Sequence, residues 1–484
     1  FLDFAWSPDA WPADKLMEYT RMWAEQQFGP AYSSEIAVLL DDYTRFNSRR
    51  KPELLEPTTY ILIHYREAEQ VVEEYNALAA KAKALYEQMP PSYKDAFYQL
   101  VLHPIEACAN LNDLYVTVGK NRLYAAQQRA SVNDLAERAR QLYQKDADLS
   151  EYYNKKLKDG KWNHMMDQTH IGYTYWQQPD KNSMPSVETN APQPEALMGV
   201  AIEGSDKWWP ESKEKAVLPQ FDPVHAQRYY IDIYNRGTRP FEVEIKAASP
   251  QIKLSATKAT VEKEMRIWVE AEWKKMPESI TEVPIIITAN GTTVEVMAVL
   301  NPLQNINLKE KGFVESNGYV AIEAEHTSRE INKGEARWLK VPGLSRTLSA
   351  MMPVPVNTTA IELDASSPRM EYDILLSTTG EISVSALLSP TLNIYNNEGL
   401  RFAVSFDDEQ PQVVNIHKGK NHRDWQESVR RNIVEFTTRH TIAKAGKHTL
   451  KVWMIDPGIV LQRIHINCGG LKPSYLGPLE SERR

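Results

Sequence analysis

The spacing of the hydrophobic residues changes near residue 197, and this change limits the fold more than any other feature of the chain. Up to about residue 170, apolar side chains recur every three to four positions, which is typical of amphipathic helices. From about residue 197 to residue 476 they alternate at every second position, which is typical of strands with one buried face. The sequence therefore predicts a multidomain α + β protein, with a helical bundle followed by β-sandwiches.

Residues 14 to about 170 are predicted to be helical. The longest apolar stripe is closed by Pro90-Pro91 and consists of Ala68, Val71, Val72, Tyr75, Leu78, Ala82 and Leu85. Cys108 lies on the next stripe, so it is predicted to be a small core residue. The basic run Arg49-Arg50-Lys51 is predicted to cap a helix or to pair across an interface, and binding of an acidic sugar is the less favoured alternative.

The strand region divides into two parts. About seven short strands in some 105 residues favour an immunoglobulin-like β-sandwich, with hairpins expected at Asn235-Arg236-Gly237 and Asn290-Gly291. The longer second part favours a larger β-sandwich or jelly roll, with one helix expected in "HRDWQESVRRNIVEF". We expect the helical bundle at 13–178, a proline-rich linker at 179–196, the first sandwich at 197–302 and the second at 303–484.

Composition argues against some partners. The formal net charge is −8, which disfavours nucleic acid and an anionic membrane surface as partners. No apolar run approaches the roughly 18 residues of a membrane-spanning helix. Cys108 and Cys468 are the only cysteines, which excludes a disulfide scaffold and a cysteine-based metal site. We expect no cofactor.

The stretch "GKWNHMMDQTHIGYTYWQQP", residues 160–179, holds the densest chemistry in the chain. His164, Asp167 and His170 form a possible metal triad, but six positions separate the histidines by about 240° around a helix, so packing and hydrogen bonding are favoured over metal binding. Aromatic residues here suit stacking on sugars, and packing against the next domain is favoured over it. The candidate domain-interface residues are Trp162, His164, Asp167, His170, Tyr173 and Trp176.

Other acidic clusters give weak signals. Asp407, Asp408 and Glu409 are predicted to occupy a turn at the end of a strand rather than to form an acid/base pair. Glu323 and Glu325 share one face of a strand and are predicted to lie at its rim, with calcium or sugar binding less favoured. Taken alone, these residues identify no catalytic site.

Six stretches, in this order, resemble the C-terminal part of glycoside hydrolase family 115: "YTRFNSRRKPELLEP", "PPSYKDAFYQLVLHPIEACANLN", "GKWNHMMDQTHIGYTYWQQP", "GLRFAVSFDDEQPQVVNI", "HTIAKAGKHTLKVWMIDPGIVLQRI" and "GGLKPSYLGPLES". Members of that family are α-glucuronidases that remove glucuronic acid or its 4-O-methyl ether from xylan with inversion. The resemblance implies that residues 1–12 are the end of a (β/α)₈ barrel. It also implies that the catalytic carboxylates lie in a preceding region that this chain does not contain.

On this resemblance we expect a non-catalytic C-terminal portion of a xylan α-1,2-glucuronidase, without catalytic residues or metal of its own. Its expected partners are the missing catalytic region, a second copy in a homodimer, and glucuronoxylan or an acidic xylo-oligosaccharide. The family implies a secreted or periplasmic location. Two alternatives stay open: a stand-alone carbohydrate-binding protein, and a complete hydrolase that uses His164, Asp167 and His170.

Two predicted loops in the last part of the chain are candidates for contact with substrate. One carries Tyr395 and Asn396 at turn-prone positions, and the other carries Trp425 among charged residues. An aromatic ring beside amides and basic groups suits the apolar face and the carboxylate of a uronic acid. The alternative, that Tyr395 and Trp425 pack onto their own sandwich, is slightly favoured.

Overall fold

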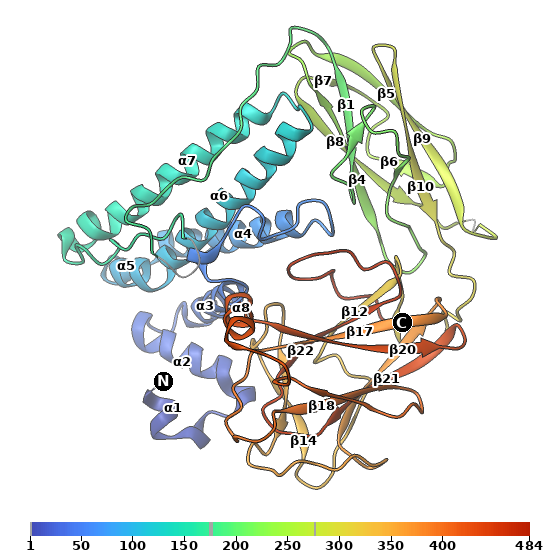
Figure 1. Cartoon of the computed structure of the whole chain (residues 1–484). Helices are drawn as coiled ribbons and strands as arrows, with labels where there is room; N and C mark the ends of the chain where they lie inside the picture. The colour runs from blue at the N-terminus through green and yellow to red at the C-terminus, as the bar shows by residue number, and fades with distance from the viewer. Residues whose placement is uncertain (1, 174–177, 275–276) are drawn as a thin grey trace.

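The computed structural model describes residues 2–173, 178–274 and 277–484. It confirms the predicted fold class, because a helical N-terminal region precedes two β-sandwiches. Figure 1 shows the helices on one side of the molecule and the two sandwiches one above the other on the other side. Among the described residues, no helix combines the length and the hydropathy that crossing a lipid bilayer requires.

Seven α-helices make up the helical region of the described chain. They are α1 (Leu2–Trp6), α2 (Leu16–Phe28), α3 (Ser33–Asn47), α4 (Glu67–Gln88), α5 (Pro91–Phe97), α6 (His103–Ala126) and α7 (Val132–Glu151). A π-helical turn at Tyr98–Leu102 joins α5 to α6. A second π-helical turn, Tyr152–Lys156, continues α7.

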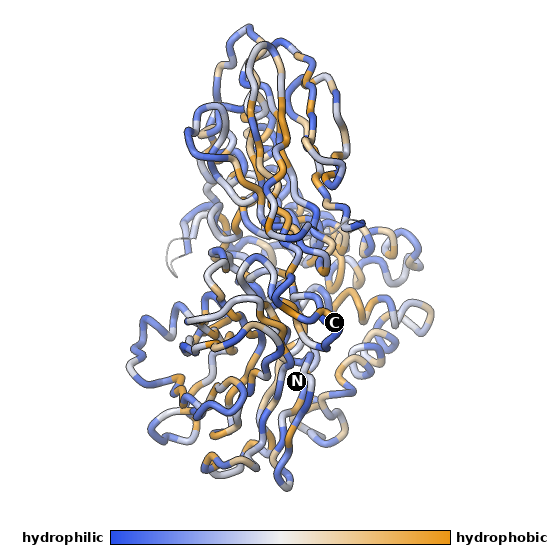
Figure 2. Tube along the Cα trace, turned by 90° about the vertical axis from the view of Figure 1, so that its right-hand side faces the viewer, coloured by the Kyte–Doolittle hydropathy of each residue, from blue (hydrophilic) through white to orange (hydrophobic). Residues whose placement is uncertain are grey.

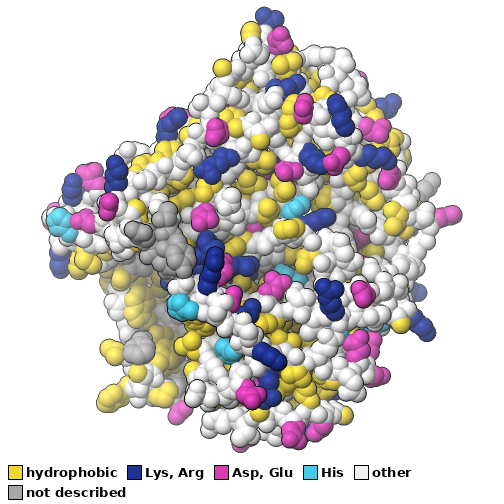
Figure 3. Space-filling view, viewed as in Figure 1, with side chains coloured by type: hydrophobic (Ala, Val, Ile, Leu, Met, Phe, Trp, Pro, Cys, Tyr) yellow, Lys and Arg dark blue, Asp and Glu magenta, His cyan; other side chains and the backbone are white. Residues whose placement is uncertain are grey.

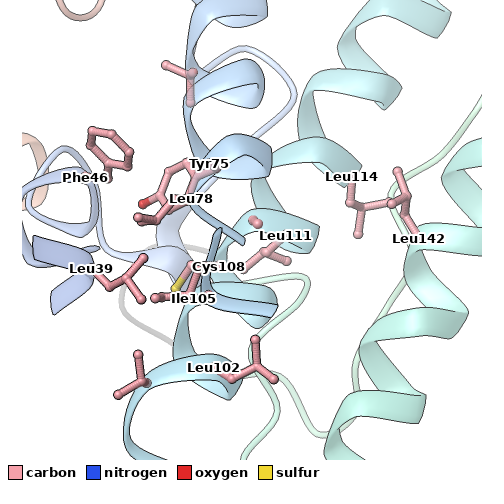
Figure 4. Packing of buried hydrophobic residues seen from close by; sticks show 14 of the residues in the cluster. Leu39, Phe46, Tyr75, Leu78, Leu102, Ile105, Cys108, Leu111, Leu114 and Leu142 are labelled. Atoms are coloured by element: carbon pink, nitrogen blue, oxygen red, sulfur yellow. The ribbon is translucent and has the colours of Figure 1, made fainter. Parts of the chain in front are cut away.

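The predicted stripes form the core of the helical region. On α4 every residue of the predicted stripe except Val72 is buried, and Val72 packs against the same core from its edge. Figure 4 shows Cys108 among Leu78, Ile105 and Leu111, which confirms it as a core residue. Burial raises the pKa of the Cys108 thiol to about 11, so the thiol stays protonated at neutral pH.

The first β-sandwich packs two five-stranded sheets face to face, in the orders β2-β1-β4-β8-β6 and β3-β10-β9-β5-β7. Val200 and Ile267 of one sheet share a core with Val243 and Ile285 of the other, and Figure 2 shows hydrophobic residues running along the strands. The strands are β1 (Met198–Ile202), β2 (Trp208–Trp209), β3 (Ala216–Val217), β4 (Arg228–Asn235), β5 (Phe241–Ala247), β6 (Ile252–Leu254), β7 (Lys258–Val261), β8 (Glu264–Ala271), β9 (Thr281–Ala289) and β10 (Thr292–Leu300).

Only one of the two expected hairpins forms. Asn290 and Gly291 have φ of 50° and 76° and join the antiparallel strands β9 and β10, as predicted. The expectation at Asn235-Arg236-Gly237 is wrong, because β4 and β5 belong to different sheets. There the backbone pairs with the incoming segment 193–197, and a Cβ on Gly237 would lie 2.0 Å from the carbonyl oxygen of Glu195.

The second sandwich also packs two sheets, in the orders β11-β16-β21-β18-β19 and β14-β15-β22-β17-β20, with β13 beside β16 and β12 beside β22. The expected helix is present as α8 (His422–Arg431). The strands are β11 (Phe313–Val314), β12 (Tyr319–Glu323), β13 (Arg329–Ile331), β14 (Arg337–Val341), β15 (Ala350–Val354), β16 (Arg369–Leu376), β17 (Gly380–Leu388), β18 (Arg401–Phe406), β19 (Gln412–Asn415), β20 (Val434–Ile442), β21 (Gly446–Met454) and β22 (Leu461–Asn467).

The expectation that Glu323 and Glu325 lie at an exposed rim is wrong. The Glu323 carboxylate is buried and lies 2.9 Å from Nε of Arg463. Glu325 pairs with the Lys340 ammonium. Each of the two carboxylates is thus paired with a cation of the same domain. The alternation of residues along the strand does not indicate these partners.

The helical region meets the first sandwich through Glu69 of α4. Its carboxylate accepts hydrogen bonds of 2.9 Å from Arg266 of β8 and lies 3.3 Å from Nζ of Lys120. Burial acts to raise the pKa of Glu69, but Lys120 and Arg266 outweigh it and lower the pKa to about 2. Arg266 also pairs with the buried Asp232 of β4 at 2.8 Å. The junction is therefore a network of ion pairs.

The helical region meets the second sandwich through Glu67, which precedes Glu69 by two residues and is buried. Its carboxylate accepts hydrogen bonds from the backbone N–H groups of Ile61 at 2.8 Å, Tyr475 at 3.1 Å and Leu476 at 2.5 Å. Burial raises its pKa, and these bonds offset only part of the effect. The Tyr475 hydroxyl donates to the carbonyl of Arg49 at 2.8 Å, so the basic run Arg49-Arg50 lies at an interface, as one predicted alternative proposed.

Candidate functional site

A pocket of about 430 Å³ opens in the helical region beside residues 165–173. Its size lies within the range of small-molecule sites. Helices α6 and α7 form its floor, and the segment after α7 forms its rim. The polar lining includes His103, Asp146 and His170, and the apolar lining includes Leu111, Met165 and Met166.

His170 is fixed over the pocket by Asp146 of α7. Its Nε2 lies 2.9 Å and 3.0 Å from the two carboxylate oxygens of Asp146. This hydrogen bond raises the pKa of His170, with burial acting against it. The side-chain oxygen of Asn182 accepts the backbone N–H groups of His170 and Ile171 at 2.8 Å and 3.0 Å, which holds this loop in place.

His103, at the start of α6, gives the pocket a second histidine of opposite character. Burial lowers its pKa to about 4, so the imidazole is neutral at pH 7. Its ring packs against Tyr153 with centroids 4.7 Å apart. Among the described residues, its buried Nδ1 has no hydrogen-bond partner. The pocket thus contains a neutral imidazole, that of His103, and a second imidazole, that of His170, whose protonated form is stabilised by Asp146.

The other histidine of the stretch points away from this pocket. His164 is exposed, and its Nδ1 lies 2.6 Å from Oδ2 of Asp167. Asp167 accepts a second hydrogen bond from Asn154 at 2.7 Å. The possible metal triad therefore does not form, because His164 pairs with Asp167 whereas His170 pairs with Asp146. In the part of the chain that the structure describes, no three His, Cys, Asp or Glu side chains are grouped so as to hold a metal ion.

Trp162 and Tyr173, the aromatic residues of the stretch that the structure describes, also lie in the helical region. Trp162 packs partly buried against the helical core, and the ammonium of Lys161 lies 4.9 Å from its ring centroid. Tyr173 lines the pocket. Trp176 lies outside the described residues. Because the contacts found for these side chains are within the helical region, their role at a domain interface stays a prediction.

Sequence reasoning missed His103 and Asp146. Both stand on helices between apolar positions, and nothing in their local pattern separates them from solvated polar residues. The signal lies in tertiary structure, because α7 and the segment 165–173 must pack on α6 before the two histidines face one pocket. This arrangement supplies hydrogen-bond donors and acceptors beside an apolar wall, which suits ligand binding.

The second set of candidates lies on the second sandwich. Tyr395 is 38% exposed, and its hydroxyl donates a hydrogen bond to the carbonyl of Val356. Asn396 has a φ of 50°, the left-handed turn conformation that its position suggests. Trp425 is half-buried on α8, which Asn421 and Asp424 cap reciprocally. Tyr395 and Asn396 thus stand on a surface loop, whereas Trp425 stands on a formed helix.

The fold resembles that of a solved protein described as a novel family GH115 4-O-methyl-α-glucuronidase with specificity for decorated arabinogalactans. The TM-score is 0.51 at 14% identity, and the match covers 94% of this chain and 43% of that one. At this identity the likeness shows the fold alone. No curated protein matches the sequence at a significant level.

Two carbohydrate-binding modules resemble parts of the chain more weakly. They are the C-terminal CBM6 of a laminarinase from Zobellia galactanivorans, with a TM-score of 0.22, 14% identity and coverage of 31% of this chain and 98% of that one, and a family 35 module from Clostridium thermocellum, with a TM-score of 0.22, 11% identity and coverage of 30% and 97%. TM-scores this low carry no argument about the fold.

Two family models match the sequence, one near each end. Residues 1–54 match glycosyl hydrolase family 115, and residues 312–480 match the glycosyl hydrolase family 115 C-terminal domain. Between them lie the helical region and the first sandwich, in a fold that follows a family 115 structure over nearly the whole chain. The two matched segments bear out the resemblance to glycoside hydrolase family 115 near each end of the chain.

Proposed function

We propose that this chain is the non-catalytic C-terminal portion of an α-glucuronidase, which hydrolyses glucuronic or 4-O-methylglucuronic acid side chains of a polysaccharide. The observation that supports this proposal is family 115 sequence at both ends of a chain that spans 43% of the length of a solved 4-O-methyl-α-glucuronidase. The chain would then support a catalytic barrel that precedes it. The segment 1–12 would be the end of that barrel, and 13–178, 179–196, 197–302 and 303–484 the domains and linker that follow.

Inverting glycosidases need an acid and a base about 6.5–9.5 Å apart on either side of the scissile bond. In the helical pocket both carboxylate oxygens of Asp146 lie against Nε2 of His170, at 2.9 Å and 3.0 Å, so Asp146 already has a hydrogen-bond partner within the protein. We therefore assign the pocket to binding and not to bond cleavage. This assignment separates the proposal from the alternative of a complete hydrolase that uses His164, Asp167 and His170.

The test compares release of glucuronic acid by two purified proteins: this chain, and a polypeptide in which the family's preceding catalytic region is joined to it. We expect release from 4-O-methylglucuronoxylan by the longer polypeptide and none by the chain alone. Turnover by the chain that is lost in His164→Ala would contradict the proposal and favour a complete hydrolase. An uronic acid-decorated arabinogalactan is the second substrate, because the solved family member is described as specific for that class.

Substrate contact by the second sandwich belongs to the same proposal. Tyr395, Asn396 and Trp425 would line the outer edge of a substrate cleft, in the same protomer or across a homodimer. In the longer polypeptide, Tyr395→Ala and Trp425→Ala should lower activity on polymer while leaving the melting temperature nearly unchanged. Loss of stability with unchanged kinetics would show that both side chains serve packing.

A family that degrades plant polysaccharides acts where the polymer is, so we propose a secreted or periplasmic location.

The second candidate is a stand-alone carbohydrate-binding protein, for which the exposed ring of Tyr395 is the favouring observation. Titration of this chain with glucuronoxylan decides between the candidates. Binding that Tyr395→Ala abolishes, together with no gain of hydrolysis in the longer polypeptide, would favour the binding protein.

A further inference from the structure

A cavity of about 700 Å³ lies where the helical region meets both sandwiches. Residues 63–66 and Gln70 form one wall, and residues of the first sandwich form the second. The third wall consists of Ser316, Asn317, Tyr319, Gly470, Lys472 and residues 479–482. Figure 3 shows charged side chains of both signs, together with histidines, near the middle of this face. The cavity exists only when all three regions are assembled, and its volume lies within the range of ligand sites.

The backbone around this cavity is strained. Tyr65, Arg66 and Asn317 have φ of 59°, 52° and 50°, a left-handed conformation that costs a residue with a Cβ about 1 kcal/mol or more. Surrounding contacts hold the strain in place: the N–H of Gly204 donates to the carbonyl of Ile63 at 2.8 Å. The N–H of Lys472 donates to the Tyr65 hydroxyl at 2.8 Å. Strain maintained by several regions is a feature of ligand sites.

Several polar side chains of the lining lack protein partners. Among the described residues, no hydrogen bond or ion pair is found for the hydroxyl of Tyr319, the amide of Gln70 or the ammonium of Lys472. Other lining groups are satisfied: the ring of His225 lies 2.9 Å from the carboxylate of Asp222. The cavity therefore offers unused donors and acceptors to a ligand rich in hydroxyl groups.

Aromatic rings complete the lining. The rings of Tyr65 and Tyr319 meet edge to face, with centroids 5.7 Å apart and planes at 81°. The ring of Tyr229 also lines the cavity, and its hydroxyl accepts from Asn317 at 3.1 Å. Tyrosine rings combine an apolar face with a polar edge, the combination that packs on the C–H face of a sugar and bonds its hydroxyls.

The charges decide between an acidic and a neutral ligand. The carboxylates of the lining are Glu203, Glu480 and Glu482, and its lysine and arginine side chains are equal in number: Arg66, Arg228 and Lys472. Burial raises the pKa of Glu203 to about 7, with the N–H of Tyr230 and nearby arginines acting against it. Near neutral pH this carboxyl both donates to and accepts from hydroxyl groups. A ligand carboxylate would meet at least as many carboxylates as cations, whereas sugar hydroxyls pair with both.

We propose that this junction cavity binds uncharged glycosyl units, the neutral backbone of a polysaccharide. The proposed function guides only the choice of probes, because binding to this chain is measured without any turnover. A negative hydrolysis assay would therefore not contradict binding in the cavity, and absence of binding would not contradict the hydrolysis result.

The test is calorimetric titration of this chain with xylohexaose, with a galactohexaose, and with free glucuronic acid. We expect saturable binding of a neutral hexasaccharide and none of glucuronic acid. Tyr319→Phe and Gln70→Ala each remove one free polar group and should weaken binding about five-fold, as expected for one hydrogen bond. Comparison of the two hexasaccharides identifies the backbone type.

Tyr152→Phe is the matched control, since it removes the hydroxyl of an exposed tyrosine outside the cavity and should leave the affinity unchanged. Melting temperatures close to that of the parent chain would show that the variants fold. Absence of saturable hexasaccharide binding, or binding that neither cavity variant weakens, would overturn the proposal. Binding of glucuronic acid in place of the neutral sugars would overturn the assignment of ligand class.

Discussion

The helical region reaches the two sandwiches through carboxylates that stand two residues apart in the first turn of α4. Glu69 binds the guanidinium of Arg266 in the first sandwich. Glu67 binds backbone N–H groups of Tyr475 and Leu476 beside the second. Burial raises the pKa of both carboxyls, and their partners lower it; the net shift is down for Glu69 and up for Glu67. Full charges outweigh burial at Glu69 whereas N–H dipoles do not at Glu67, so the kind of partner decides whether a buried carboxylate favours its ionised form.

The two junctions consequently respond to pH in opposite ways. A carboxyl whose pKa is lowered by folding stabilises the folded state above its ordinary pKa, and this contribution is lost as the pH falls through the folded pKa. A carboxyl whose pKa is raised stabilises the folded state below its ordinary pKa, and this contribution is lost as the pH rises through the folded value. Four substitutions test this contrast.

The largest expected effect is that of Arg266→Ala. It removes the cation that Glu69 and Asp232 share. Breaking a buried ion pair costs up to about 3–5 kcal/mol of the free energy of unfolding, and Lys120 and Arg129 still pair with the two carboxylates, so we expect the lower end of this range. Arg228→Ala is the matched control, because both arginines lie over the ring of Trp268 but the pair of Arg228 with Glu270 is half-exposed. That control should cost less than about 1 kcal/mol. Equal urea midpoints for the two variants would refute the network.

Glu69→Gln should cost up to about 3 kcal/mol at pH 7, which corresponds to a pKa lowered from 4.5 to about 2. The deficit relative to the parent chain should stay constant above pH 4.5 and shrink as the pH falls toward 2. Urea unfolding of both proteins between pH 7 and pH 3 measures it. A deficit that is independent of pH would mean that Glu69 acts by packing alone.

Glu67→Gln should give a pH dependence of opposite sign. The amide keeps one acceptor oxygen for three N–H groups, so we expect a cost of about 2 kcal/mol at acid pH. Because the parent chain loses its own contribution as the pH rises, the deficit should shrink from pH 4 toward pH 8. Urea unfolding of this variant and the parent chain between pH 4 and pH 8 measures the deficit. If both variants showed deficits of the same pH sign, the contrast between the junctions would fail.

The smallest expected effect is that of Tyr475→Phe, which removes the hydrogen bond to the carbonyl of Arg49 and keeps the ring. The cost should be about 1 kcal/mol and independent of pH near neutrality. Tyr395→Phe removes a comparable bond at the surface, to the carbonyl of Val356, and should change stability by less than about 0.5 kcal/mol. Thermal unfolding compares the two, and a larger loss in Tyr395→Phe would contradict this order.

Part of the architecture could be predicted from local patterns. The stripe on α4 and the turn at Asn290-Gly291 form as expected, because each depends on residues that are close in sequence. The same turn signal fails at Asn235-Gly237, where the segment 193–197 supplies the backbone partners. His103 and Asp146 could not be predicted for the same reason. They line a pocket formed by three elements, and the sequence of any one element does not indicate it.

The order of helices and sandwiches and the resemblance to family 115 can be inferred from the chain alone, because hydrophobic spacing and the order of six motifs lie along it. Which buried carboxylates meet charges, which meet N–H groups, and where the three regions enclose a cavity depend on the tertiary structure. Glu67 and Glu69 show the physical reason. Their residue type and helix position are alike, and electrostatic energy depends on the distance to partners about 200 and 400 residues away, which local spacing does not encode.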